Sequence, residues 1–67
     1  MTRKVLERIE RENVNVYLNI KSLKEWHKQT EKHDVSLAEI RGYLTALLQL
    51  GFITEAEKRV LHCYMTL

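Results

Sequence analysis

The sequence predicts a mainly α-helical fold: one domain over residues 1–67, built as a small bundle of about four short helices, with a short extended segment near residues 14–20 as an open alternative. The chain contains no proline and only two glycines, so few positions interrupt a helix. Apolar residues make up 45% of the chain and recur at helical spacing along most of it. A serine or threonine stands three residues before a glutamate at Ser22, Ser36 and Thr54, which is the pattern of a capping box at the start of a helix.

The most regular pattern runs over residues 35–51 and predicts a central helix. Its apolar residues fall on one broad arc, wide enough to contact more than one neighbouring helix. Gly51 can adopt the left-handed backbone conformation that closes the last turn of a helix. The arc consists of Leu37, Ile40, Tyr43, Leu44, Leu47, Leu48 and Leu50.

Two further helices are predicted before the central one. Residues 3–12 place three apolar residues on one face and pairs of opposite charges at i,i+4 spacing on the other, as in a solvated surface helix. A second helix is predicted over residues 22–32, because Ser22 and Glu25 form a capping-box sequence at its start.

Residues 13–21 fit two structures. Their apolar residues alternate with polar ones, which is the spacing of a strand, and several of them are β-branched. The same segment also fits one long helix, in which Val16, Tyr17 and Ile20 continue the apolar stripe of residues 3–12. The extended interpretation is preferred because Ser22 predicts a new helix start, and a lone strand would need another copy or a partner to pair with.

The last helix is predicted to begin at Glu55 and is apolar on two sides. A helix of this kind is normally covered on both sides, and a chain of 67 residues has little material for the second. Leu61 and Met65 form one side at i,i+4 spacing and are predicted to extend an exposed apolar patch. The side expected to pack against the central helix consists of Ala56, Val60, Cys63, Tyr64 and Leu67.

Charge and cysteine content restrict the classes of protein. Eleven Lys and Arg against nine Asp and Glu give a formal net charge of +2, too balanced to indicate a nucleic-acid binder by itself. A single cysteine forms no internal disulfide and fits a reducing compartment. No stretch approaches the roughly 20 apolar residues of a membrane span. A cytoplasmic location without a membrane partner is therefore expected.

No group of residues has the pattern of an enzyme site. His62 and Cys63 are adjacent, but neighbours on a helix point about 100° apart and do not form a catalytic pair. Cys63 is therefore expected to be a small core residue. In the set His27, Glu31 and His33, the third residue lies well round the helix from the other two, which does not suit a metal. We expect no catalytic residue, cofactor, metal or small-molecule substrate.

These observations favour a small non-enzymatic regulatory protein that acts by protein–protein interaction as a homodimer. Trp26, the only tryptophan, is expected first as an anchor between the second and the central helix, and second as an interface residue. The candidates for self-association are Leu61 and Met65, and those for contact through a strand or with a protein partner are Val14, Val16, Tyr17 and Leu18.

A second hypothesis comes from residues 22–54, where two helices are joined by a short turn and the second ends in Leu44-x-x-Leu47-x-x-x-Gly51-Phe52-Ile53-Thr54. This arrangement resembles the helix-turn-helix part of winged-helix DNA-binding domains. The resemblance implies a DNA-binding transcriptional regulator with residues 16–20 as its first strand, although a capped helix from Glu55 stands where that family has a β-hairpin wing. The side chains offered to DNA are those of Lys24, Lys28, Arg41, Thr45 and Gln49.

Overall fold

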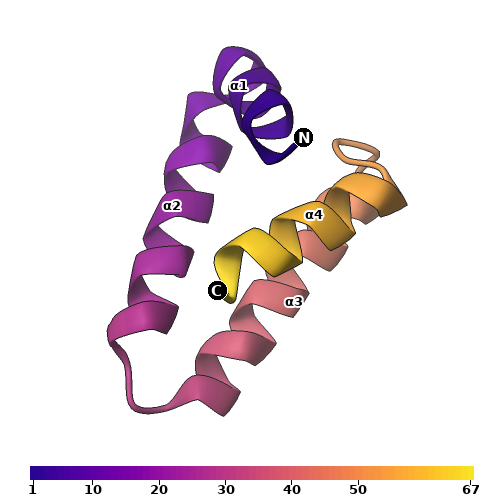
Figure 1. The fold of residues 1–67 in the computed structure, drawn as a ribbon. Helices are drawn as coiled ribbons and strands as arrows, with labels where there is room; N and C mark the ends of the chain where they lie inside the picture. The colour runs from indigo at the N-terminus through magenta and orange to yellow at the C-terminus, as the bar shows by residue number, and fades with distance from the viewer.

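The computed structural model describes residues 1–67 and confirms the predicted small helical bundle, with 82% of the residues in helices and no strand. Figure 1 shows α2 and α3 as two long arms joined at one end by a short connection, while α1 crosses the other end of α2. Helix α4 packs against α3 and also contacts α2 and α1. The helices are α1 (Thr2–Glu12), α2 (Val14–Gln29), α3 (His33–Gln49) and α4 (Glu55–Met65).

One small apolar core joins all four helices. Only ten of the 67 residues are buried, and nine of these are apolar. Burying such a side chain contributes about 1.5 to 3 kcal/mol, so a core of this size leaves a thin margin over the entropy lost on folding. The core consists of Val5, Ile9, Ile20, Ile40, Leu44, Leu47, Ile53, Leu61 and Met65.

The expected orientation of the last helix is wrong. Leu61 and Met65 are 0% exposed, so they form no exposed strip and cannot make a surface contact with another molecule. Helix α4 contacts α1 and α2 as well as α3, and these three neighbours together cover the side that carries Leu61 and Met65. Cys63 is exposed, which also corrects its placement in the core.

The prediction of an extended segment near residues 14–20 is wrong as well, because the chain is helical from Val14 to Gln29. The break between α1 and α2 is confined to Asn13, whose backbone is extended with φ −159° and ψ 96°. The Asn13 side-chain oxygen accepts hydrogen bonds from the backbone N–H groups of Asn15 and Val16, at 3.1 and 3.2 Å. Asn13 is thus a helix N-cap, and Ser22 lies inside α2 without a capping role.

Of the three capping-box sequences, only the one at Thr54 forms a capping box in the structure. Its hydroxyl accepts from the backbone N–H of Glu57, whose carboxylate accepts from the backbone N–H of Thr54. Helix α3 begins one turn earlier than Ser36, which is fully buried. Gly51 has a φ of 75°, as expected for the residue that ends the central helix.

Candidate protein interface on helix α2

Helix α2 is apolar on two opposite sides. Ile20 is fully buried, and Val16, Tyr17 and Leu23 pack against the core on the inner side. On the other side, Val14 and Leu18 leave 51% and 52% of their surface exposed, and Trp26 leaves 40%. Trp26 is absent from the core, and its expected role as an anchor between α2 and the central helix stays a prediction.

The exposed apolar residues stand on a side of α2 that carries one charged residue, Glu25. The other exposed polar residues on this side are Asn15, Asn19, Ser22 and Gln29. We call this surface the α2 outer face, defined by Val14, Asn15, Leu18, Asn19, Ser22 and Trp26. Single exposed apolar residues are normal in folded proteins, whereas a helix side that gathers three large apolar residues among amides resembles an interface.

The structure separates the seven interface candidates into three groups. Val14, Leu18 and Trp26 lie on the α2 outer face, where a partner can reach them. Val16 and Tyr17 point to the core side of the same helix, where both are half-buried. Their assignment to a partner surface depended on the strand, and it fails because a helical backbone turns them away from Val14 and Leu18. Leu61 and Met65 are core residues, as described above.

A groove with a volume of about 550 Å³ between α2 and α3 adjoins the α2 outer face and shares Asn19 and Ser22 with it. Asn19 Nδ2 donates a hydrogen bond of 3.2 Å to the Tyr43 hydroxyl across one end of the groove. This groove was not predicted from the sequence. Its signal is the pair Ala38 and Gly42, two small residues at i,i+4 spacing on α3 that keep the groove open.

Of the residues proposed for DNA contact, Lys24 is engaged within the chain. Lys24 Nζ donates a hydrogen bond of 2.8 Å to the backbone carbonyl of Tyr64 and lies 4.6 Å from the centroid of its ring. The ammonium group of Lys24 therefore interacts favourably with the negative end of the α4 dipole. Arg41 and Gln49 are exposed on α3, and Thr45 is half-buried. Lys28 is exposed on α2.

Lys21, one turn before Lys24, contacts the same tyrosine. Its Nζ donates a hydrogen bond of 3.1 Å to the Tyr64 hydroxyl, and this bond, with the charges of Tyr64 and Tyr17, raises the pKa of Lys21 above its ordinary value. Lys21 and Lys24 therefore connect α2 to the end of α4.

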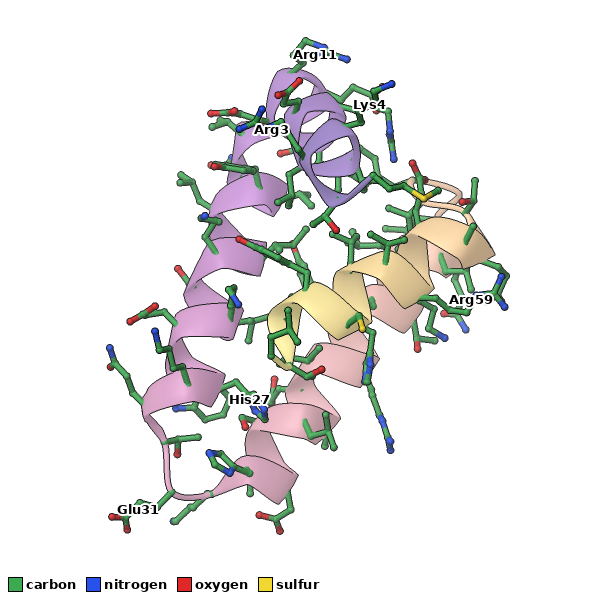
Figure 2. All side chains as sticks on the ribbon, in the orientation of Figure 1. Arg3, Lys4, Arg11, His27, Glu31 and Arg59 are labelled. Carbon is green, nitrogen blue, oxygen red and sulfur yellow. The ribbon has the colours of Figure 1, made fainter.

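Near the connection between α2 and α3, the buried hydroxyl of Ser36 forms hydrogen bonds with both His27 and His33. His27 points from α2 toward α3 (Figure 2), where its Nδ1 forms a hydrogen bond with the buried Ser36 hydroxyl. Ser36 Oγ also donates to the backbone carbonyl of His33 at 3.2 Å. Because a hydroxyl has one proton, both bonds form together when His27 Nδ1 carries the proton and donates to Oγ. No three His, Cys, Asp or Glu residues are grouped as metal ligands.

A second apolar groove, with a volume of about 490 Å³, lies where the start of α1 meets the outer side of α4. This outer side is the one that was expected to face the core. The groove is lined by Met1, Thr2, Arg59, Val60, Cys63, Tyr64 and Leu67. Figure 2 shows Arg59 on α4, and Arg3, Lys4 and Arg11 on α1.

No protein-family model, curated protein or solved structure matches this chain. None of the four helices has both the length and the apolar content that crossing a bilayer requires.

Proposed function

We propose that this is a small non-enzymatic regulatory protein that acts by protein–protein interaction and works as a homodimer. The observation that carries the proposal is the α2 outer face, where Val14, Leu18 and Trp26 are exposed on one side of the helix. Tryptophan at the centre of a desolvated patch is among the residues that contribute most to binding.

The size of the core supports association. With ten buried residues and no disulfide, the monomer gains stability from any contact that removes further apolar surface from water. A face that exposes large apolar side chains on a chain of this size supplies such a contact. We further propose a reducing, cytoplasmic location, which is supported by the exposed thiol of the only cysteine.

A matched pair of variants tests the proposal. Leu18→Glu places a charge in the α2 outer face, and Gln49→Glu places the same charge on exposed α3. We expect size-exclusion chromatography with light scattering, at about 100 µM protein, to give a dimer for the wild type and Gln49→Glu and a monomer for Leu18→Glu. A monomeric wild type would contradict the proposal. An apolar contact should also persist in high salt, where exposed ion pairs are screened.

Two observations weigh against the alternative, a winged-helix-like DNA-binding regulator. Its first strand is replaced by the first turns of α2, and Lys24 is held against the end of α4. Fluorescence anisotropy with labelled duplex DNA tests this alternative. Binding that falls steeply between low and moderate salt, and weakens in Arg41→Ala, would favour it.

A further inference from the structure

We infer that His27 and His33 form a binding site for a divalent transition-metal ion such as Zn²⁺, at the connection between α2 and α3. The observation that carries this inference is the contact between the two imidazole rings, whose centroids lie 5.0 Å apart at an interplanar angle of 44°. The site goes beyond the proposed interaction function and does not depend on the α2 outer face.

The two histidines come from different helices. His27 stands in the last turn of α2, which ends at Gln29, and His33 is the first residue of α3. A metal was not expected from the sequence, because His33 was placed well round the helix that carries His27. That reason does not hold in the structure, since the chain turns between the two residues and brings their rings into contact.

The separation of the rings fits two ligands of one metal ion. Because Zn–N bonds are about 2.0 to 2.1 Å long and meet at tetrahedral angles, two imidazoles bound to one Zn²⁺ have their centroids about 5 Å apart. The rings of His27 and His33 already stand at this distance. Binding therefore requires rotation of a ring and no movement of the helices.

The His27 ring is held in the manner of a metal ligand by its other nitrogen. Its Nδ1 forms a hydrogen bond with the buried Ser36 hydroxyl, which in turn donates to the His33 backbone carbonyl at 3.2 Å. With the proton on Nδ1, the lone pair that can bind a metal is on Nε2. Metal-binding histidines generally donate their second ring nitrogen to a fixed partner, which sets the tautomer and the ring orientation. Ser36 is thus a positioning residue for this site.

The nitrogens that would bind the ion are accessible. His27 Nε2 forms no hydrogen bond within the chain and is not a buried atom. His33 is exposed, and its ring forms no hydrogen bond either, so the ring can turn a nitrogen toward an ion held by His27. One ligand is therefore fixed and the other adjusts to it.

No third protein side chain completes the site. Glu31 lies between the two histidines in the sequence, but Figure 2 shows its side chain pointing away from His27. Water therefore takes the other positions around the ion. With half the protein ligands of a structural zinc site, the pair should bind with about half the free energy, which corresponds to a dissociation constant of about 1 to 100 µM.

A bound ion connects the end of α2 to the start of α3. At this end the two helices are joined by residues 30–32 alone, and only ten residues of the chain are buried. An ion that binds both histidines binds the folded chain more tightly than the unfolded one, so it raises stability by mass action. The site therefore makes the stability of this small bundle depend on the metal concentration.

Calorimetric titration with ZnCl₂ tests the site in a Cys63→Ser background, which removes the only thiol. We expect one ion per chain with a dissociation constant in the range given above. His33→Gln should weaken binding at least about tenfold while the chain still folds, because His33 is exposed. His62→Gln removes the only other histidine and is the matched control, which should bind as tightly as the background protein. Mg²⁺ should not bind, because it prefers oxygen ligands.

Thermal unfolding and NMR provide readouts that do not depend on the heat of binding. Saturating Zn²⁺ should raise the Tm of the Cys63→Ser protein by about 4 °C or more and leave that of its His33→Gln variant unchanged. In NMR spectra of the imidazole nitrogens, Zn²⁺ should shift the signals of His27 and His33 and not those of His62. Equal zinc affinity with and without His33→Gln, or no binding at about 1 mM Zn²⁺, would overturn the site.

Discussion

The guanidinium of Arg8 and the carboxylate of Glu57 lie 2.9 Å apart and connect α1 to the start of α4. The same Glu57 oxygen accepts a hydrogen bond of 2.9 Å from the backbone N–H of Thr54 and so completes the capping box. Arg8 also pairs with Glu12 at 2.7 Å. One carboxylate thus caps α4 and holds α1 against it.

Substitution of Glu57 should separate these two roles. Glu57→Gln keeps an acceptor for Thr54 but removes the charge that faces Arg8. Glu57→Ala removes both, so we expect it to lower the free energy of unfolding by about 1 to 2 kcal/mol and Glu57→Gln by about half as much. Urea denaturation measures both values, with Glu39→Ala on exposed α3 as the control. Equal effects of the two Glu57 variants would show that the hydrogen bond from the Thr54 backbone N–H to the Glu57 side chain contributes nothing to the free energy of unfolding.

The two apolar sides of α4 should respond very differently to truncation. Leu61→Ala and Met65→Ala each remove a fully buried side chain, and we expect a loss of about 2 to 5 kcal/mol in unfolding free energy. Leu67→Ala should change it by less than about 0.5 kcal/mol because Leu67 is exposed. Thermal and urea unfolding test this order. The reverse order would place Leu61 and Met65 on the surface.

The buried hydroxyl of Ser36 should fix the packing of α2 against α3. Ser36→Ala removes a partner of His27, and an unsatisfied half-buried polar group costs about 1 to 3 kcal/mol. We expect Ser36→Ala to be destabilised by that amount in urea denaturation, although alanine favours a helix more than serine does. His27→Ala combined with Ser36→Ala should cost less than the sum of the single changes. Additive effects would show that the two side chains act independently.

The contact between Lys21 and Tyr64 predicts the direction of one pH effect. The hydrogen bond to Tyr64 raises the pKa of Lys21 in the folded protein, so its contribution to stability is fully present below the pKa of the unfolded chain. It is lost as the pH rises through the folded pKa. We expect Tyr64→Phe to lower the pKa of Lys21, measured from the NMR shifts of its ε protons, with Tyr43→Phe as a control. An unchanged pKa in Tyr64→Phe would contradict the contact.

The fold class and the central helix could be predicted because their signals are local. The apolar arc of α3 contains Ile40, Leu44 and Leu47, which are all buried in the structure, and Gly51 has the expected conformation. The sides of α4 could not be assigned in the same way. Its sequence shows two apolar sides, and the side that becomes buried depends on α1 and α2, which approach α4 only in the folded chain.

The helical start of α2 could not be predicted from the sequence for a related reason. Val14 and Leu18 are apolar but exposed, so apolar residues occupy both sides of the helix and the helical period is obscured. Had these positions been polar, Val16, Tyr17 and Ile20 would have indicated a helix. The residues that obscure the helical period are thus part of the α2 outer face.

Sedimentation equilibrium of the wild-type protein tests the proposed homodimer most directly. The chain has a mass of 8.0 kDa, and we expect the weight-average mass to rise toward twice that value as the concentration increases to about 100 µM. The Leu18→Glu variant should keep the mass of one chain over the same range. A wild-type protein that sediments as a single chain at every concentration would contradict the homodimer.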